Sequence, residues 1–307
     1  MTCNYDAVLL IGFGGPTRPE EVRPFLDNVL LGRQIPRNRY EEVVHHYEVM
    51  GGSSPYNRQI EKQAAALRAL LGCRGAGLPV YVGMRNWAPL LLSVIGEIAR
   101  SGARRVLGFV LAPHRCEASW DRYIASVDEA VNNSGAVHLK IDYPPPWNNH
   151  PLFIEAWAER LRASIAQLDD AERSKAVIVF TAHSIPVAMA GASAYVEQLR
   201  ESSRMVAQAL NWHHWSIGYQ SRSGNPHEPW LEPAIGDLVR TIEGPLIVAP
   251  IGFVCDHIEV LYDLDVEAAA VAREAGIKLL RAQTIGEHPR FIEMIAAMIL
   301  GSTPGSP

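Results

Sequence analysis

The sequence predicts an α/β protein made of two similar halves, each with a four-stranded parallel sheet flanked by helices. Short segments rich in Val, Ile and Leu alternate with longer segments of helical period along the 307 residues. The short segments are apolar throughout, which is typical of parallel strands that are covered on both faces. The halves also echo one another, because "VLAPHRCEASWDRY" (110–123) and "IVAPIGFVCDHIEV" (247–260) each leave an apolar strand through Ala-Pro.

The expected elements follow this alternation in order. Strands are expected at 7–13, 79–84, 105–113, 137–143, 176–183, 215–221, 245–253 and 277–283. Helices are expected at 19–31, 56–72, 89–101, 118–132, 151–168, 192–210, 230–242, 257–275 and 287–300. Three consecutive prolines in "DYPPPWNNHP" (142–151) break regular structure between the two sets. We therefore expect an N-terminal half over 1–148, a C-terminal half over 149–284, a last helix within 285–303 that could pack back on the first half, and a frayed tail over 304–307.

Composition excludes several classes of protein. With 48% hydrophobic residues the chain can bury a substantial core, and its net charge of −5 offers no overall basic field for nucleic acid. No apolar run approaches the length of a transmembrane helix, and "MTCNYDAVLLIGFGG" lacks the basic region and cleavage site of a signal peptide. The cysteines form no CxxC pair and are expected to be reduced thiols; they are Cys3, Cys73, Cys116 and Cys255. We expect a cytoplasmic monomer and leave peripheral membrane contact open.

The ends of the expected strands carry the candidate functional residues. Ligands of such folds bind beyond the carboxyl ends of the strands, here in the cleft expected between the halves. The first strand runs into "GFGGP" (12–16), which lets the backbone approach a ligand but is not GxGxxG, so a dinucleotide site is disfavoured. After the second strand, Arg85 stands near Trp87, a combination suited to a flat ligand that carries carboxylates. The third and fifth strands run into His114 and His183, although a lone histidine there is more often structural.

An acidic column comes after the seventh strand. Glu259, Asp263 and Glu267 recur every four residues, so they share one face of a helix, where like charges repel by a few tenths of a kcal/mol per pair. No Lys or Arg compensates them at the next turn, which fits a path for cations or protons better than a surface face, although a surface face stays open. A histidine such as His183 and a carboxylate such as Glu259 in one cleft can bind a divalent metal or take up protons. HExxH, GxSxG and GxxxxGK[ST] motifs are absent, which disfavours zinc hydrolases, serine hydrolases and nucleoside triphosphate enzymes.

These residues resemble a known family, the ferrochelatases, which insert ferrous iron into a porphyrin. The resemblance rests first on "FTAHSIP" (180–186) and "PIGFVCDHIEVLYDLDVE" (250–267), in the family's order and separation. It extends over nearly the whole chain through "LLIGFGGP" (9–16), "HYEVMGGSSPYNRQ" (46–59), "YVGMRNWAP" (81–89) and "YQSRSGNPHEPWLEP" (219–233). It implies two Rossmann-like halves, of the flavodoxin or chelatase type, around an active-site cleft.

The resemblance also implies roles for individual residues. His183 matches the family's active-site histidine and Glu259 the acid that faces it, and the pair flanks the macrocycle. Asp263 and Glu267 match an acidic ridge between that site and solvent, so the metal-handling residues would be His183, Glu259, Asp263 and Glu267. The residues implied to bind the porphyrin are Phe13, Arg33, Ser54, Arg85 and Tyr123. The sequence leaves open whether His183 accepts pyrrole protons or hands over iron.

The expected substrate is coproporphyrin III. The stretches "FGGPTRPEEVRPFLDNVLLGRQIPRNR" and "MRNWAP" resemble the bacterial branch that inserts Fe²⁺, as substrate, into this porphyrin to give coprohaem III and two protons in haem biosynthesis. The extra propionates would suit Arg85, His114 and Arg115. The chain departs from many members of that branch, which have Tyr in place of Phe13 and His in place of Asn86. No cysteine follows Cys255, so we expect no [2Fe–2S] cluster, and we expect no nucleotide.

Other functions stay open beside this one. The chain could be a protoporphyrin IX ferrochelatase that makes protohaem, or a chelatase of the same fold that inserts cobalt or nickel into a sirohydrochlorin. Sites of the latter kind tend to present two histidines, whereas here His183 faces Glu259. A non-catalytic carrier of haem or another tetrapyrrole is the alternative from a different class. Porphyrin is the expected partner, nucleic acid is not, and transient contact with neighbouring haem-pathway enzymes stays open.

Overall fold

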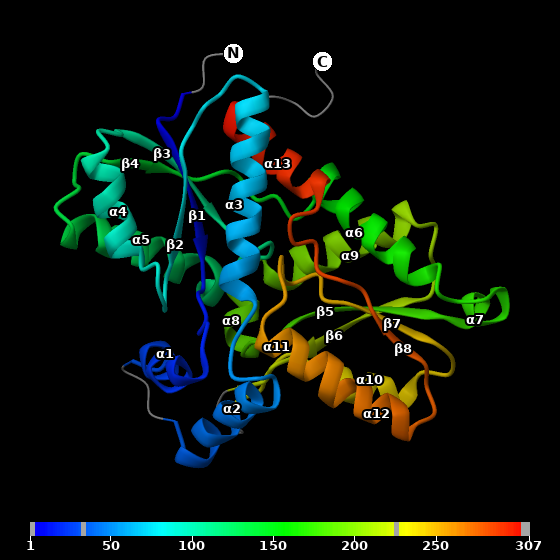
Figure 1. Ribbon diagram of the computed structural model, residues 1–307. Coiled ribbons are helices and arrows are strands. Elements are labelled where there is room, and N and C mark those ends of the chain that lie inside the picture. The colour runs from blue at the N-terminus through cyan, green and yellow to red at the C-terminus, as the bar shows by residue number, and fades with distance from the viewer. Residues whose placement is uncertain (1–3, 32–34, 224–226, 302–307) are drawn as a thin grey trace. The chain divides into compact units, whose positions relative to one another are not determined.

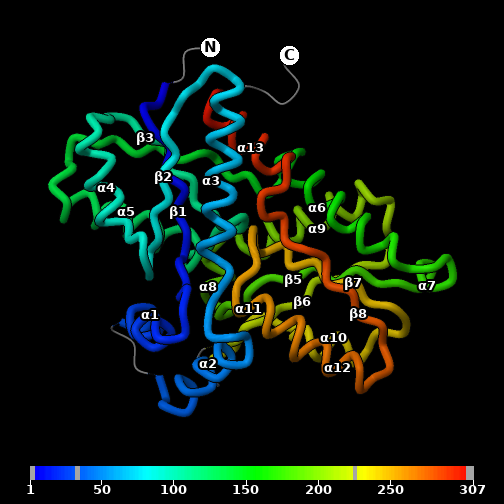
Figure 2. Tube along the Cα trace, in the orientation of Figure 1, coloured from blue at the N-terminus to red at the C-terminus, as the bar shows by residue number. Residues whose placement is uncertain are grey.

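The computed structural model describes residues 4–31, 35–223 and 227–301, and the chain divides into two compact units. Unit 1 comprises the described parts of Met1–Leu111, Trp120–Pro145 and Phe291–Pro307. Unit 2 comprises Ala112–Ser119 and the described parts of Pro146–Arg290. Each unit contains one four-stranded parallel sheet, which confirms the predicted fold class. Figures 1 and 2 show helices packed along each sheet.

The sheet of unit 1 has β1 near its centre. Its strands are β1 (Ala7–Gly12), β2 (Val80–Met84), β3 (Arg105–Val110) and β4 (Lys140–Asp142), in the order β2-β1-β3-β4. Every residue of β1 is buried, as expected for a central strand with helices on both faces. The carboxyl end of β1 therefore lies between those of β2 and β3, so loops that leave these three strands share one edge of the sheet.

The helices of unit 1 are placed by apolar stripes. They are η1 (Pro19–Glu21, a 3₁₀ turn), α1 (Val22–Val29), α2 (Arg37–Val49), α3 (Tyr56–Cys73), α4 (Leu91–Arg100), α5 (Arg122–Asn133) and, from Phe291, α13 (Pro289–Leu300). In α4 the buried residues Leu91, Val94, Ile95 and Ile98 recur at helical spacing, and this stripe packs against β2. Burying each such side chain contributes about 1.5–3 kcal/mol, so this stripe holds α4 against the sheet.

The sheet of unit 2 repeats the plan of the first. Its strands are β5 (Val177–His183), β6 (Trp215–Gln220), β7 (Leu246–Ala249) and β8 (Leu279–Arg281), in the order β6-β5-β7-β8. The third strand along the chain in each sheet, β3 or β7, pairs with the first and the fourth. These two strands precede the two Ala-Pro segments that echo one another in the sequence, so the internal echo reflects equivalent positions in the two sheets.

Helices cover both faces of the second sheet. They are α6 (Pro151–Ile165), α7 (Asp170–Lys175), α8 (Val187–Gly191), α9 (Tyr195–Ala209), α10 (Ile235–Thr241), α11 (Ile258–Val260), the π-helix η3 (Leu261–Ala268) and α12 (Ala269–Glu274). A short π-helix, η2 (Glu117–Asp121), lies across the division between the two units. Val260 and Leu264 join one apolar cluster with Val179 of β5 and Val248 of β7. This cluster buries the apolar face of the segment after β7. The acidic residues of that segment are therefore placed on its other face.

Several expected helices differ from the observed ones. The expected helix 257–275 is divided into α11, η3 and α12, and the expected helix 230–242 begins only at Ile235, after Pro233. Helices α2, α7 and α8 were not predicted from the sequence. Helix α2 buries only Val44 and Tyr47, so its apolar stripe is too thin to be recognised by period. Helix α7 is short and depends on a capping box between Asp169 and Glu172.

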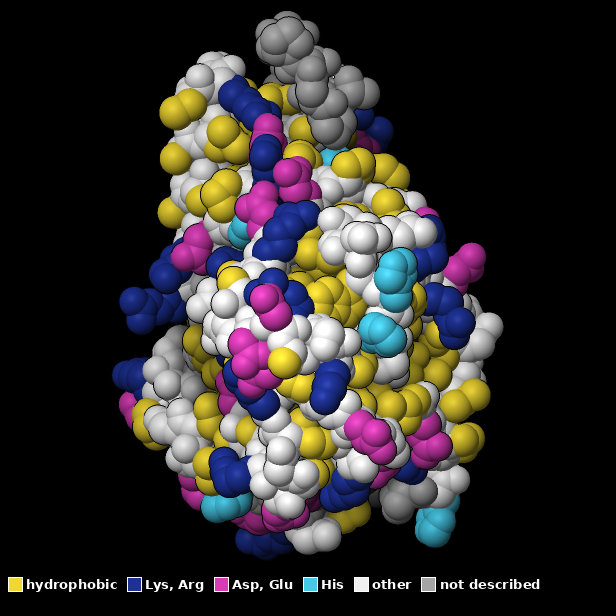
Figure 3. Space-filling model, turned by 90° about the vertical axis from the view of Figure 1, so that its right-hand side faces the viewer, with side chains coloured by type: hydrophobic (Ala, Val, Ile, Leu, Met, Phe, Trp, Pro, Cys, Tyr) yellow, Lys and Arg dark blue, Asp and Glu magenta, His cyan; other side chains and the backbone are white. Residues whose placement is uncertain are grey.

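The molecular surface agrees with the modest net charge. On the face drawn in Figure 3, acidic and basic side chains are interspersed and neither sign gathers into one field. Among the helices of the described ranges, none combines the length and the apolar character needed to cross a bilayer.

Candidate functional site

The first candidate residue, His183, is the last residue of β5. Its Nδ1 is hydrogen-bonded to the carbonyl oxygen of Ser184, and its own carbonyl accepts a hydrogen bond of 2.9 Å from the Tyr195 hydroxyl. A carbonyl oxygen can only accept, so Nδ1 must carry the proton and, in the neutral ring, Nε2 is left with its lone pair. The side chain is 28% exposed. The backbone contacts thus present a basic nitrogen at the strand end, suited to accept a proton or bind a metal.

Glu259 faces this nitrogen. The distance from His183 Nε2 to Glu259 Oε2 is 3.8 Å, and the carboxylate side chain is 54% exposed. The two residues meet because they lie at the ends of neighbouring strands: β5 ends at His183, and the segment after its partner β7 carries Glu259. The predicted pairing of this histidine and this acid is therefore present in unit 2.

A glycine and a histidine position the Glu259 segment. The Gly252 N–H donates to Thr181 O at 3.0 Å, and a Cβ at Gly252 would lie 2.7 Å from the Ala182 Cα, so only glycine allows this approach to β5. The side chain of His257 caps α11 by accepting a hydrogen bond of 3.2 Å from the Val260 N–H. Its ring also packs edge-on against Phe253, with centroids 4.7 Å apart. These contacts set where α11 begins and so where Glu259 projects.

Asp263 lies in the π-helix and is buried. The residue is 9% exposed, and its carboxylate accepts a hydrogen bond from the Ser221 hydroxyl. Burial is the largest influence on this carboxyl and raises its pKa from 3.8 to about 7, with further upward contributions from the charges of Glu259 and Glu267. A carboxyl group with that pKa exchanges protons readily near neutral pH. The middle member of the acidic column can therefore act as a proton donor and acceptor, whereas Glu259 and Glu267 are exposed.

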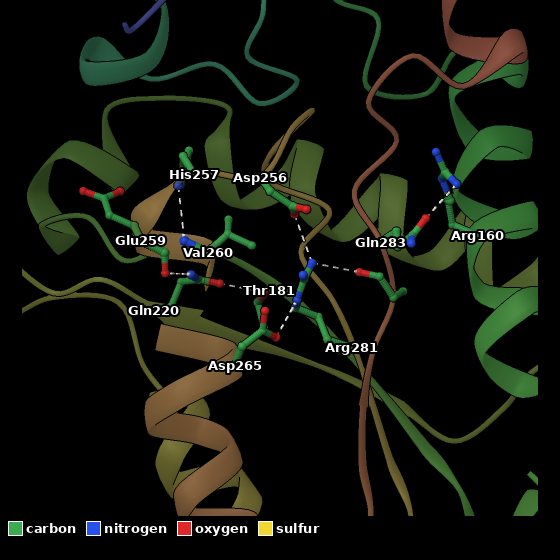
Figure 4. A network of polar contacts seen from close by, with 11 residues as sticks. Arg160, Thr181, Gln220, Asp256, His257, Glu259, Val260, Asp265, Arg281 and Gln283 are labelled. Carbon is green, nitrogen blue, oxygen red and sulfur yellow. Dashed lines mark hydrogen bonds and ion pairs between the residues drawn. The ribbon is translucent and has the colours of Figure 1, made fainter. Parts of the chain in front are cut away.

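Gln220 connects these groups and was not singled out by the sequence analysis. Its Oε1 accepts from the Thr181 hydroxyl at 2.9 Å, and its Nε2 donates to the Glu259 carbonyl at 3.1 Å and reaches Asp263 Oδ2 at 3.5 Å. Figure 4 shows Gln220 between Thr181 and the backbone of Glu259. Its position could have identified it from the sequence, because Gln220 is a polar residue at the buried carboxyl end of β6, where ligands of such folds bind.

The acidic column does not form a closed metal cage. Within the residues that the structure describes, no group of three or more His, Cys, Asp or Glu side chains is arranged to hold a metal ion. His183 and Glu259 form a pair, while Asp263 is engaged by Ser221 and Gln220. The arrangement offers one nitrogen and one carboxylate with open positions, which suits an ion in transit better than a structural ion.

Phe13 comes directly after β1 in unit 1 and is held by its backbone and by packing. Its N–H donates to the Tyr56 hydroxyl at 2.9 Å, and its carbonyl accepts from the Asn86 side chain at 3.2 Å. The next residue, Gly14, has a φ of +90°, which favours glycine. The Phe13 ring lies 6.2 Å from the Phe25 ring in an edge-on arrangement. Half-buried and braced from behind, Phe13 can present an aromatic surface to a flat ligand.

The other candidate residues of unit 1 are less open. Arg85 is half-buried, its Nε donates to Ser126 Oγ at 3.1 Å, and burial lowers its pKa, with a partly offsetting influence of Tyr123. Ser54 and Tyr123 are both buried, and the Ser54 hydroxyl accepts from the Tyr56 N–H at 3.3 Å. Arg33 lies outside the described residues.

The expectation that His114 serves a propionate is wrong. His114 is only 1% exposed, and its Nε2 lies 3.1 Å from the Ser202 hydroxyl inside unit 2. Burial lowers the pKa of this imidazole to about 3, so the ring is neutral at physiological pH. Position at a strand end did not reveal that this histidine points into the core.

The comparisons with known proteins agree with this geometry. The family model of the ferrochelatases matches residues 5–303. The chain belongs to the ferrochelatase family. The ferrochelatase of Rhodopirellula baltica is 41% identical over 300 residues, which cover 96% of this chain and 85% of that protein. The coproporphyrin III ferrochelatases of Streptomyces coelicolor and Mycolicibacterium smegmatis are each 40% identical, covering 96% of this chain and 85% and 89% of theirs. As a member of the ferrochelatase family the chain is an enzyme, as predicted.

Solved structures of other chelatases share the fold. The sirohydrochlorin chelatase SirB from Bacillus subtilis subspecies spizizenii matches with a TM-score of 0.58 and 9% identity, covering 95% of this chain and 93% of that one. CbiX, the terminal enzyme of sirohaem biosynthesis in denitrifying bacteria, matches with a TM-score of 0.58 and 17% identity, covering 97% and 99%. At these identities the likeness shows the fold alone, and the ferrochelatase assignment rests on the sequence relatives.

Proposed function

We propose that this ferrochelatase inserts Fe²⁺ into coproporphyrin III, giving coprohaem III and releasing two protons. The observation that carries the proposal is the pairing of His183 Nε2, left basic by the contact of Nδ1 with Ser184, with the Glu259 carboxylate 3.8 Å away. The choice of porphyrin is supported by the relatives near 40% identity that are named coproporphyrin III ferrochelatases.

In this proposal His183 and Glu259 act together on the porphyrin nitrogens. A free-base porphyrin must lose two pyrrole protons as iron enters, so a base close to the ring accelerates the reaction. His183 accepts the proton on Nε2, and Glu259 stabilises the imidazolium formed and relays the proton onward. Asp263, whose pKa is raised to about 7, and the exposed Glu267 carry it to solvent. The opposite assignment, in which His183 and Glu259 deliver Fe²⁺, uses the same lone pairs.

The residues of unit 1 bind the macrocycle in this proposal. Phe13 lies against the porphyrin face, and Arg85 pairs with a propionate through the part of its guanidinium that Ser126 leaves open. Ser54 and Tyr123 shape the same region from buried positions. Arg33 is retained as a propionate partner from the family resemblance.

Anaerobic metallation tests the proposal. Purified protein, Fe²⁺ and either coproporphyrin III or protoporphyrin IX would be mixed, and the porphyrin absorption bands monitored over time. We expect faster insertion into coproporphyrin III, and we expect His183→Ala to lower kcat by about 10²–10⁴-fold. His213→Ala, at an exposed histidine, is the matched control and should insert iron at the wild-type rate.

Each other outcome has a defined meaning. A preference for protoporphyrin IX would keep the ferrochelatase reaction and overturn the choice of substrate. Insertion of cobalt or nickel into sirohydrochlorin in place of iron into either porphyrin would indicate another chelatase activity. Binding of porphyrin without insertion of any divalent metal would contradict the enzymatic role and indicate a carrier.

A further inference from the structure

The segment that carries Asp263, which begins two residues after Glu259, adopts a rare conformation. Residues Leu261–Ala268 form a π-helix of eight residues between α11 and α12. Long π-helices are rare because the α-helix is the more stable alternative for the same residues, so a π-helix persists where tertiary contacts hold it. The apolar cluster holds one side of this segment through Leu264 and Ala268. On its polar side Asp263 accepts hydrogen bonds from Ser221 and Gln220, and a further restraint acts on Asp265.

That restraint is Arg281, the last residue of β8. Its side chain is 14% exposed, its Nη1 donates to Asp256 Oδ1 at 3.0 Å, and its Nε donates to Asp265 Oδ1 at 2.6 Å. Figure 4 shows the guanidinium between the two carboxylates. Asp256 immediately precedes the cap of α11, and Asp265 lies within the π-helix. One side chain therefore ties together both ends of the stretch that contains Glu259 and Asp263.

We propose that Arg281 is a positioning residue for the iron-insertion reaction. By holding Asp256 and Asp265 on one guanidinium, it fixes the start of α11 relative to the π-helix and so keeps Glu259, which lies in α11, opposite His183. If this restraint is lost, the hydrogen bonds of the segment can return to α-helical spacing, which rotates the residues before the π-helix relative to those after it. The inference rests on the proposed function, because the reaction it supports is the one proposed there.

The chemistry of arginine matters for this role. A guanidinium presents several donors in a planar fork and can serve two carboxylates in fixed directions, whereas a lysine ammonium is a single point charge on a flexible chain. A buried ion pair is weak evidence for overall stability, because desolvation opposes the charge attraction. Positioning, more than stability, is therefore the role that these partly buried ion pairs suit.

The test compares four variants of the full chain. Arg281→Met removes both contacts, Arg281→Lys keeps the charge, and Asp265→Asn weakens one contact on a side chain that is 37% exposed. Lys278→Met is the matched control, because Lys278 directly precedes β8 and pairs with Glu172 at 2.8 Å. The readouts are kcat and KM for coproporphyrin III with Fe²⁺, and amide hydrogen exchange of residues 257–268 in the protein without substrate.

We expect Arg281→Met to lower kcat by about 10- to 100-fold while KM for the porphyrin stays within about twofold. Exchange in 257–268 should become faster in that variant and change little elsewhere. Arg281→Lys should recover part of kcat, Asp265→Asn should show a smaller loss, and Lys278→Met should resemble the wild type. If Arg281→Met fails to fold, Asp265→Asn replaces it as the decisive variant. The inference would then be overturned if Asp265→Asn changed neither kcat nor the hydrogen exchange of residues 257–268.

The inference would also be overturned if folded Arg281→Met kept the wild-type kcat and hydrogen exchange. An equal loss of kcat in Lys278→Met would overturn it as well. Failure of the proposed function is separable from these results. In that case the wild type itself binds porphyrin without inserting iron, and the exchange of residues 257–268 alone still decides whether Arg281 holds the segment.

Discussion

The two sheets of this ferrochelatase have the same strand order and different chemistry at their strand ends. In unit 1 the end of β1 presents a glycine-rich turn and Phe13, braced by Phe25, Tyr56 and Asn86. In unit 2 the equivalent end of β5 presents His183, with Glu259 facing it from the segment after β7. One set of strand ends presents an aromatic ring, and the other presents an imidazole paired with a carboxylate, which in the proposed function serve porphyrin packing and proton transfer respectively.

Two carboxyl groups express the same contrast. Glu21 of unit 1 accepts hydrogen bonds from Thr17, Arg18 and Trp87. These hydrogen bonds lower the pKa of Glu21 to about 2, and the one from the backbone N–H of Thr17 has the largest influence. Asp263 of unit 2 is buried beside other acids, and its pKa is raised to about 7. A carboxylate kept ionised serves as a fixed acceptor, whereas one that titrates near neutrality can move protons. The repeated fold thus holds an acid with a lowered pKa in one unit and an acid with a raised pKa in the other.

The largest expected effect comes from the reactive side of this comparison. Glu259→Gln keeps the shape of the side chain and removes its charge, so in the proposed mechanism protons accepted by His183 lose their relay. We expect kcat for iron insertion to fall by about 10²–10⁴-fold with little change in porphyrin KM. Stopped-flow absorbance under anaerobic conditions measures this. Glu274→Gln, at an exposed acid of α12, is the control, and an equal loss there would show a general charge effect.

Asp263→Asn should raise stability in a pH-dependent way. The pKa is 3.8 when unfolded and about 7 when folded, so between these values the folded state binds more protons and stability falls as pH rises. Asn removes that penalty. We expect the difference in the free energy of unfolding between variant and wild type to grow between pH 4 and pH 8 by on the order of 4 kcal/mol, as the rise in pKa from 3.8 to about 7 implies. The lost contacts with Ser221 and Gln220 lower the stability of the variant at every pH without changing this growth.

Urea unfolding of wild type and variant at several pH values measures the gain. Asp237→Asn, at an exposed aspartate paired with Arg240, is the control and should show no such trend. A gain that is the same at pH 5 and pH 8 would contradict the assignment of a raised pKa to Asp263 and weaken its place in the proton path.

On the packing side of the comparison, Phe13→Ala should weaken porphyrin binding. Loss of the aromatic surface should raise Kd for coproporphyrin III about tenfold, while kcat at saturation changes less. Fluorescence titration measures Kd. Phe13→Tyr keeps the ring and adds a hydroxyl, so it should bind about as well as the wild type. A large loss of kcat with unchanged Kd in Phe13→Ala would place Phe13 with the reactive residues and break the division between the units.

Much of this arrangement could be predicted from the sequence because it is local. The strands β1 to β8 all fall within the expected ranges, since apolar runs bounded by turns are read directly from composition. The meeting of His183 and Glu259 could be expected from their positions after strands of one sheet, together with the family resemblance. Functional residues at or just beyond the carboxyl end of a strand are the ones that the sequence identifies best.

The conformation of the acidic segment could not be predicted in the same way. A spacing of four residues lies close to the period of an α-helix, about 3.6 residues, and also to the wider turn of a π-helix. Acids at 259, 263 and 267 therefore line one face in either case, and only tertiary contacts decide between them. Arg281 stands 16 and 25 residues from its two carboxylate partners, so no local pattern announces it. His114 shows the converse, because a strand-end histidine gave no sign of being buried.

The smallest expected effect tests the acid with the lowered pKa in unit 1. Glu21→Gln removes the charge that holds Thr17, Arg18 and Trp87, and we expect it to lower the free energy of unfolding by about 1 kcal/mol at pH 7. The folded pKa is depressed, so this stability is present above the unfolded value of 4.5 and is lost as pH falls towards 2. The difference between wild type and variant should therefore shrink on acidification.

The same urea experiments measure this trend, with Glu20→Gln as the control at an adjacent exposed acid. For Asp263→Asn the variant gains on the wild type as pH rises, whereas for Glu21→Gln it loses ground as pH rises through the window from about 2 to 4.5. Opposite slopes are required if the two units hold their acids for different purposes. Two slopes of the same sign would mean that the contrast between a fixed and a titrating carboxyl group does not hold.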